Sequence, residues 1–285
     1  MRKTLFLYIL FFSFQAYSQV GIHLLGEKRV YKEETKYITI DTCKVRLQYY
    51  MSYAKDTNNP KKKHEEYMLL QCGKHISKFS NYFLLKADSL SSVYAIQKMN
   101  EEEALNKLTP IIMGCDQLNI FKDYPNAKIT VTDMVPGRGF FRYVEEKSKQ
   151  NWKLGQGSMI ICGYECRKAT TTFRGRRYVA WYAPKIAIGD GPWKFWGLPG
   201  LILQVTDEKN EYSFESVAIT KPRYIDAIYL NIEDYFLITK KKFYESIKKT
   251  YENPGASLES RGILIDGKAP INIKSRPYNP IELSD

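Results

Sequence analysis

The first residues to consider are those that commonly act as nucleophiles, general bases or metal ligands. They are few: three histidines, His23, His64 and His75, and five cysteines, Cys43, Cys72, Cys115, Cys162 and Cys166. A zinc-protease helix starting at His64 would need a second histidine where Met68 stands. The segment 72–75 and the pair Cys162/Cys166 have ligand-like spacing, but no second short pair completes either one. We therefore predict no metal site and no cofactor.

Two further motifs that would indicate a cofactor or a nucleophile are incomplete. Gly155-Gln156-Gly157 lacks the third glycine of a dinucleotide-binding loop, because Ile occupies position 160. The same missing glycine excludes a nucleophile elbow around Ser158. A dispersed hydrolase site remains the alternative to a binding protein. It would take a Cys–His pair in a deep pocket, or a cluster of Asp190, Asp207 and Glu208.

A cluster of arginines lies among aromatic residues in the second half of the chain. Arginines that flank aromatic rings grip anionic groups or stack on a partner. The competing interpretation is a solvated hairpin around Arg174-Gly175-Arg176, with arginine stems packed over Tyr and Trp. Both interpretations stay open at this point. The candidate binding residues are Arg174, Arg176, Trp181, Trp193 and Trp196.

The hexapeptide at positions 197–202 has a backbone explanation for its residues. Pro199 presets φ and Gly200 supplies a positive φ, which together predict a type II turn. Leu201–Leu203 lacks polar alternation, so this strand should be covered on both faces. None of these residues is a nucleophile, an acid or a base. We therefore predict an architectural motif made of Gly191, Pro192, Gly197, Leu198, Pro199, Gly200, Leu201 and Ile202.

Short alternating segments dominate the rest of the chain. Strands are predicted at 44–53, 66–72, 128–135, 140–144, 159–162, 166–173, 177–182, 201–206 and 212–219. Helical periodicity is found in 87–107, with Asp88 or Ser89 as N-cap, and again after the N-cap Thr239. Many short strands without intervening helices predict a mainly β, α+β fold. We expect an antiparallel sheet or open half-barrel with two or three helices. The tail after Gly262 should lie over the surface.

The chain resembles the GLPGLI family of exported proteins from Bacteroidetes-type bacteria, which is named after the hexapeptide at 197–202. The resemblance covers most of the mature chain and also rests on 69–79, 166–170, 180–182, Gly191-Pro192 and 278–283. Tyr182-Ala183 departs from the Tyr-Thr of many relatives. Because the family has no established activity, the resemblance implies export but no reaction.

The N-terminus has the three parts of a cleavable signal peptide. Arg2 and Lys3 form the basic start, Leu5–Phe12 the apolar core, and Ala16 and Ser18 the small residues before the cut. The apolar core is shorter than the roughly 20 residues that cross a bilayer. We expect residues 1–18 to be removed near Ser18, which leaves a single β-rich domain at residues 19–285. That protein would be periplasmic or secreted and would not span a membrane.

The mature chain is basic and rich in aromatic residues, with 22 Tyr and 14 Phe. Loss of Arg2 and Lys3 leaves 41 basic residues against 31 acidic ones, a net charge of about +10. In the envelope this charge favours an anionic component or an outer-membrane protein as partner, whereas nucleic acid is not expected. The odd number of cysteines does not indicate a disulfide framework. The leading hypothesis is a non-enzymatic binding or assembly module for a peptide, lipid or outer-membrane partner, with an envelope hydrolase as the alternative.

Overall fold

The computed structural model describes residues 29–33, 36–135, 138–259 and 273–284. The predicted signal peptide at 1–18 lies outside the described residues. The chain divides into two compact units, and the single domain expected at 19–285 stays a prediction. One unit is Met1–Thr35 with Phe83–Asp116, and the other is Lys36–Tyr82 with Gln117–Asp285. Among the described residues, no helix is long and apolar enough to cross a membrane.

The smaller unit is helical where it is described. Its helices are α1 (Tyr82–Ile96), which starts at the boundary of the unit, and α2 (Glu101–Ile112). Asn100 caps α2, because its side-chain oxygen accepts a hydrogen bond from the Glu103 amide at 3.2 Å. The prediction of one helical segment at 87–107 is therefore wrong in its extent. Asp88 and Ser89 lie inside α1 rather than at its start.

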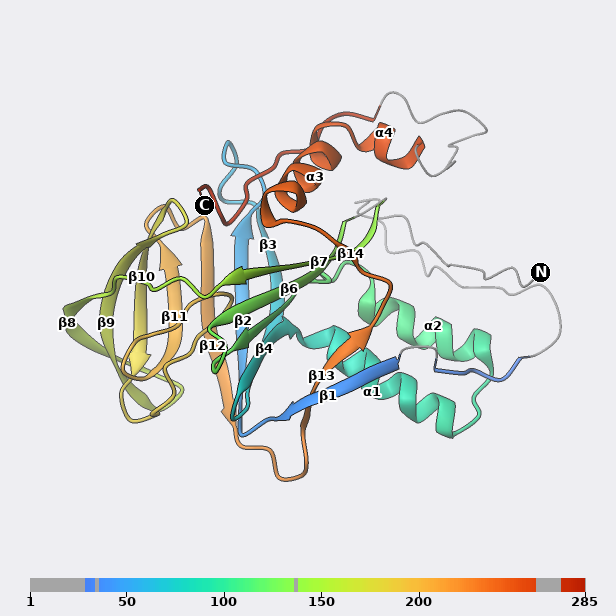
Figure 1. Ribbon diagram of the computed structural model, residues 1–285, viewed down its shortest axis with the longest axis horizontal. Helices are drawn as coiled ribbons and strands as arrows, with labels where there is room; N and C mark the ends of the chain where they lie inside the picture. Colours follow the sequence, from blue (N-terminus) through green and yellow to red (C-terminus); the bar gives the residue numbers. More distant parts are fainter. Residues whose placement is uncertain (1–28, 34–35, 136–137, 260–272, 285) are drawn as a thin grey trace. The chain divides into compact units, whose positions relative to one another are not determined.

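The larger unit is built on a twelve-stranded sheet with the order β14-β7-β6-β5-β4-β3-β2-β12-β11-β10-β9-β8 (Figure 1). Its strands are β2 (Val45–Ala54), β3 (Lys63–Cys72), β4 (Ile76–Asn81), β5 (Asn119–Asp123), β6 (Lys128–Val135), β7 (Gly139–Glu146), β8 (Lys153–Ile161), β9 (Tyr164–Phe173), β10 (Arg176–Ala183), β11 (Leu201–Asp207), β12 (Tyr212–Thr220) and β14 (Phe236–Leu237). Only the pair β14–β7 is parallel among these strands. A separate two-stranded sheet pairs β1 (Lys36–Thr42) with β13 (Ala227–Ile232).

The predicted mainly β fold with few helices is confirmed. Two helices follow the sheet, α3 (Lys240–Glu252) and α4 (Pro254–Glu259), which makes four in the described chain rather than two or three. Thr239 caps α3 as predicted, since its side chain accepts a hydrogen bond from the Lys242 amide. Phe243 of α3 is buried, with its ring 5.1 Å from that of Tyr143 in β7.

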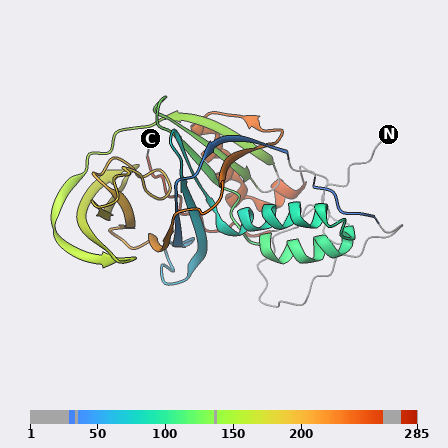
Figure 2. The ribbon, with the colours of Figure 1, turned by 90° about the horizontal axis from the view of Figure 1, so that it is seen from below.

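The loop 184–200 between β10 and β11 fills the interior of the curled sheet. In Figure 2 the strands β8 to β10 curve around this loop. Phe195 at its centre is fully buried, and its ring lies 4.7 Å from Tyr178 of β10 and 6.3 Å from Phe214 of β12. Trp193 packs beside it at 5.2 Å. The loop is therefore part of the hydrophobic core.

The strand after this loop is covered on both faces, as predicted. Leu201, Ile202 and Leu203 are each 0% exposed. A β-bulge places Gln204 opposite Trp181 and Ile202 opposite Tyr182, so Leu203 is the extra residue. The Tyr49 hydroxyl donates to the Ile202 carbonyl at 2.5 Å. The run is apolar because the bulge and the loop leave none of its three side chains in solvent.

The turn before this strand differs from the predicted type II turn. Gly200 has the expected positive φ, at +149°. Its amide donates to the Leu198 carbonyl at 2.8 Å, which is the hydrogen bond of an inverse γ-turn around Pro199. The Leu201 amide, which a type II turn would use, donates instead to Ile186 at 3.1 Å. A Cβ atom at Gly200 would overlap the Ala183 carbonyl oxygen and lie 2.7 Å from its carbon.

Replacing Gly200 by Ala should destabilise the fold much more than replacing Gly197 by Ala. Both glycines have a positive φ, but only the added methyl at Gly200 meets neighbouring backbone, since nothing lies within 4 Å at Gly197. Backbone strain alone costs about 1–2 kcal/mol at either position. Overpacking adds roughly 1–3 kcal/mol at Gly200. Denaturant unfolding of both variants measures the difference, and equal losses of stability would show that the close approach to Ala183 is unimportant.

Candidate functional site

The interior loop carries a buried ion pair into the core. The carboxylate of Asp190 pairs with Lys122 of β5, and both side chains are at most 1% exposed. The Lys122 ammonium also donates to the Gly191 carbonyl at 2.6 Å, and the Tyr124 hydroxyl donates to Asp190 at 2.5 Å. Buried charges need such partners, because desolvation costs several kcal/mol per ion. Asp190 therefore anchors the loop and is not available as a catalytic acid or base.

A hydroxyl and a thiol near Asp190 are held in their neutral forms. Burial, followed by the negative charge of Asp190, raises the pKa of the Tyr124 hydroxyl, which stays protonated as a donor. The same two causes raise the pKa of the Cys72 thiol well above its usual value. A thiol kept protonated by burial is a poor nucleophile.

A second buried cluster joins the loop to the end of the chain. Lys194 of the loop pairs with Glu145 of β7 and, at 2.5 Å, with Glu282. Lys240 of α3 reaches the other oxygen of Glu282 at 2.7 Å, and Arg174 reaches Glu145 at 2.8 Å. Burial alone would raise the pKa of Glu282, but Lys194 and Lys240 outweigh it and hold the pKa below its usual value.

Arg176 holds the same C-terminal segment from the hairpin side. Its guanidinium is 3% exposed, and it donates to Asp207 at 3.1 Å, to Glu211 at 2.6 Å and to the Asn279 side chain at 2.6 Å. Asn279 in turn donates to the Ala54 carbonyl at 2.8 Å. The prediction that the tail lies over the surface is wrong for its last described residues, because Asn279 and Glu282 are only 8% and 7% exposed.

The predicted binding residues therefore separate into two groups. The first group makes its contacts within the protein and consists of Arg174, Arg176 and Trp193. The two arginines therefore neither bind an external ligand nor form a solvated hairpin. Trp196 is half-buried, and its indole donates to the Ser148 carbonyl at 3.1 Å. Trp181 is half-buried in β10. Only the two half-buried tryptophans keep ring surface for a partner.

The architectural residues all lie at or within this loop. The Gly191 carbonyl accepts a hydrogen bond from the Lys122 ammonium. A Cβ atom added at Gly191 would lie 2.8 Å from the Cβ atom of Ile202. The Ile202 amide donates to the Asp190 carbonyl at 2.9 Å, and Leu198 is buried. These contacts give Gly191, Leu198 and Ile202 packing roles in the core.

Most of the described thiols, and His64, have partners of their own. Burial raises the pKa of Cys43 to about 12 and that of Cys166 to about 11, and each thiol donates to a backbone carbonyl. Cys162 likewise donates to the Ser216 carbonyl at 3.1 Å. His64 lies 2.6 Å from Glu66. These contacts do not bring a thiol to an imidazole.

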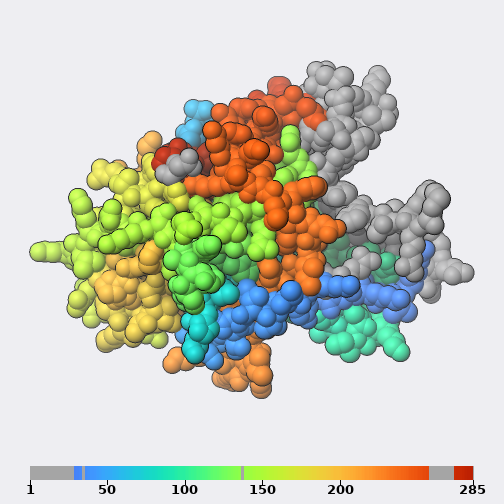
Figure 3. Space-filling model, viewed as in Figure 1, coloured from blue at the N-terminus to red at the C-terminus, as the bar shows by residue number. Residues whose placement is uncertain are grey.

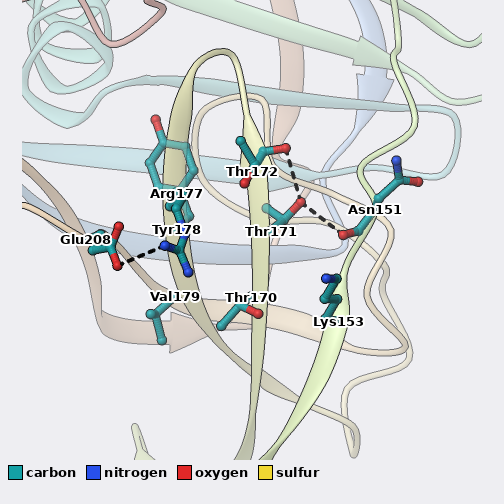
Figure 4. A pocket seen from close by; sticks show the side chains of 9 residues that line it. All are labelled: Asn151, Lys153, Thr170, Thr171, Thr172, Arg177, Tyr178, Val179 and Glu208. Carbon is teal, nitrogen blue, oxygen red and sulfur yellow. Dashed lines mark hydrogen bonds and ion pairs between the residues drawn. The ribbon is translucent and has the colours of Figure 1, made fainter.

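A groove of about 350 Å³ lies over β8, β9 and β10 (Figure 4). It is lined by Asn151, Lys153, Thr170, Thr171, Thr172, Arg177, Tyr178, Val179 and Glu208. Lys153, Thr172 and Arg177 are exposed, and Arg177 forms an ion pair with Glu208 at 3.3 Å. The groove therefore presents two cations and two threonine hydroxyls to solvent, in contrast to the buried charges of the core.

Strand register explains how this groove is assembled. Tyr178 points toward Phe195 in the core, so its neighbours Arg177 and Val179 point to the opposite face. Thr172 pairs with Arg177, and Thr170 lies between Lys153 and Val179. The two cations thus flank a row of threonines. Trp181 follows Val179 on the same face.

Sequence reasoning missed most of this groove. It placed residue 177 in the predicted strand 177–182, but it did not indicate that Lys153 lies beside the threonines, because they meet only through pairing of β8 with β9. The alternation within 166–173 was the available clue, since it places Thr170 and Thr172 on one face and Thr171 on the other.

Replacing Glu282 by Gln should reduce stability at neutral pH by about 3 kcal/mol, because Lys194 and Lys240 lose a buried counter-charge. The pKa of Glu282 is depressed in the folded state, so its contribution is full above the unfolded value of about 4.3 and is lost as the pH falls through the folded pKa. The gap between wild type and variant should therefore shrink toward pH 3.

Unfolding free energies measured from pH 3 to pH 7 test this expectation. Glu252→Gln is the control, because the Glu252–Lys248 pair is exposed on α3 and contributes little. A Glu282→Gln deficit that stays constant over the whole range would contradict the ionised state of Glu282.

Comparisons with known proteins find one family profile and distantly similar solved structures. A family profile described as "Protein of unknown function (Porph_ging)" matches residues 174–204, which include the hairpin arginines and the interior loop. No protein of curated function matches the chain. Crystal structures of PNGF-II in space groups P21 and C2 are similar at 13% identity, with TM-scores of 0.49 and 0.46. The matches cover 74% of this chain and 34% of those chains, so this chain spans about a third of their length.

Proposed function

We propose that the protein is an exported binding protein and that the groove over β8, β9 and β10 takes an anionic, hydroxylated component of the cell envelope. One observation carries the proposal. Lys153 and Arg177 are exposed cations on one face, whereas Lys122 and Lys194 are buried and neutralised inside the protein. Of these four cations, only the two in the groove are accessible to an external anion.

The hydrolase alternative has little support from the acids that it would need. Asp190 is paired with Lys122, and Asp207 with Arg176, at side-chain exposures of at most 3%. Glu208 is 61% exposed but faces Arg177 in solvent. A pair of carboxylates that shares one open pocket, as acid–base hydrolysis requires, is not formed by these residues.

The groove has the size and chemistry of a small polar site. Its volume of about 350 Å³ is near the lower end of ligand pockets, which run from about 300 to 1,000 Å³. Arg177 suits a carboxylate, phosphate or sulfate, because its planar guanidinium binds such groups through two hydrogen bonds. Thr170, Thr172 and Asn151 supply partners for hydroxyl groups. The ligand we propose is an acidic sugar unit, which offers a carboxylate to Arg177 and hydroxyl groups to the threonines.

Export and family membership are part of the same proposal. The signal-peptide pattern at 1–18 supports export, and the net charge of about +10 that remains after loss of Arg2 and Lys3 favours an acidic partner. The profile match at 174–204 contains the hexapeptide on which the resemblance to the GLPGLI family rests. We propose membership of that family on these two grounds.

Arg177→Ala should weaken binding of D-glucuronate about tenfold, because a hydrogen bond to a charged group contributes roughly 1.5 kcal/mol. Glu208→Gln should strengthen binding, since it releases Arg177 from its ion pair. Amide NMR titration measures both effects, and the shifted signals should include those of Thr170 and Thr172.

Two controls separate a site from general attraction to a basic protein. Uncharged D-glucose should bind more weakly than glucuronate, and Lys61→Ala, in the exposed turn between β2 and β3, should leave the affinity unchanged. If Arg177→Ala and Lys61→Ala have the same small effect, the groove is not the binding site.

Isolation from the native host should yield a protein whose N-terminus is at or near Gln19, because Ala16 and Ser18 fit a signal-peptidase site. Mass spectrometry of the intact protein from the envelope or culture medium measures this. A mature pool that retains Met1 would contradict export without affecting the groove.

A further inference from the structure

The loop between β12 and β13 exposes two large apolar side chains to solvent. Ile225 is 91% and Tyr224 88% exposed, the highest values among the large hydrophobic residues of the described chain. Lys221 and Arg223 precede them and are also exposed. The loop projects from the end of the sheet in Figure 1 and from the surface in Figure 3. Two apolar side chains displayed in this way contribute nothing to the core.

The base of this loop is fixed to the sheet. Asp226 forms an ion pair with Arg46 through the Nε and Nη2 atoms of its guanidinium, and it accepts a hydrogen bond from the Gln71 side-chain amide at 3.2 Å. The Cys43 amide donates to the Asp226 carbonyl at 2.8 Å. The strands on either side are paired up to Thr220 and from Ala227 onward. Tyr224 and Ile225 are therefore displayed at a defined place.

The neighbouring loops at this end of the sheet are basic. Lys44 precedes β2, and its amide donates to Cys72 of β3, after which Lys74 follows in the turn to β4. Both lysines are exposed, and neither forms an ion pair with a described residue. The acidic residues of these loops already have partners. The Asp41 carboxylate accepts hydrogen bonds from the backbone amides of His75 and Ile76 at 2.7 and 3.0 Å, and Asp226 forms its ion pair with Arg46.

We propose that this end of the sheet is a membrane-docking face, on which Tyr224 and Ile225 enter the interface of an anionic bilayer. The cations Lys44, Lys74, Lys221 and Arg223 would meet its phosphate groups. Tyrosine and aliphatic side chains are suited to the headgroup boundary, and nearby cations are attracted by anionic lipid. A convex tip of two side chains is far from the roughly 800 Å² per partner of a stable protein interface. The inference does not depend on the ligand of the groove.

Co-sedimentation with vesicles tests the docking face. The protein as purified from expressing cells, with its N-terminus checked by mass, is mixed with vesicles of phosphatidylcholine alone or with 30 mol% phosphatidylglycerol (about a third anionic lipid). We expect binding to the anionic vesicles that falls with added salt. Lys221→Ala with Arg223→Ala should weaken it roughly 25-fold, since each cation contributes about fivefold.

The apolar tip is tested by Tyr224→Ser with Ile225→Ser, which should weaken binding at least about tenfold. Leu237→Ser is the matched control, because Leu237 is also exposed, at 80%, but lies in the edge strand β14, away from the loop after β12. Melting temperatures confirm that each variant is folded. Equal loss in the control and the tip variant, or binding that ignores phosphatidylglycerol, would overturn the proposal. A tip variant that binds like wild type would also overturn it.

Discussion

The structure depends on the neutralisation of charges that the loop 184–200 carries into the core. An ammonium or carboxylate transferred from water to a protein interior is stable only with close, well-oriented partners. Asp190 finds Lys122 on β5, and Lys194 finds Glu145 on β7 and Glu282 near the C-terminus. Each pair requires the loop to lie at one height within the sheet. A shift of the loop by one residue would leave the charges of Asp190 and Lys194 without partners. The ion pairs therefore fix the position of the loop more strictly than apolar packing alone would.

The same constraint separates the parts of the molecule that serve the fold from those left for a partner. Charged side chains within the core are paired with opposite charges and are inaccessible to solvent. Their presence in the sequence is therefore explained by the stability of the fold. The exposed face of β8, β9 and β10 has no such explanation, since Lys153, Thr172 and Arg177 pack against nothing in the core. That face is therefore a better candidate for a ligand site than the arginines and tryptophans of the segment 174–196.

Sequence patterns predicted the strands well where one face is buried. The alternation in 44–53 and 212–219 follows directly from burial of Tyr49 and Phe214, and the two strands pair with each other. Thr239 and Gly200 were predictable because capping and a positive φ have local chemical signatures. The short strand β5 was missed, since Lys122 stands at its core position and its counter-charge lies far away in the chain.

The groove and the buried tail were unpredictable for a related reason. Arg176 is a surface residue by type, and only the joint presence of Asp207, Glu211 and Asn279 makes its burial favourable. Those partners come from two separate parts of the sequence, the connection between β11 and β12 and the C-terminal segment. Likewise Lys153 and Arg177 become neighbours of the same threonines only when three strands are in register. Side-chain type and local spacing do not show which residues from distant parts of the chain will come into contact.

The burial of Asn279 has a consequence for how the chain acquires its structure. Asn279 bonds to Ala54, 225 residues earlier, and Glu282 completes the charge balance around Lys194. Contacts between such distant parts form late, because the intervening chain must first be brought together. Until residue 282 has left the ribosome, Arg176 lacks its bond to Asn279 and Lys194 lacks its pair with Glu282, so the contacts around the loop are incomplete. Folding around the loop is therefore completed only after nearly the whole chain has been synthesised, and a fragment that ends before residue 279 cannot form these contacts.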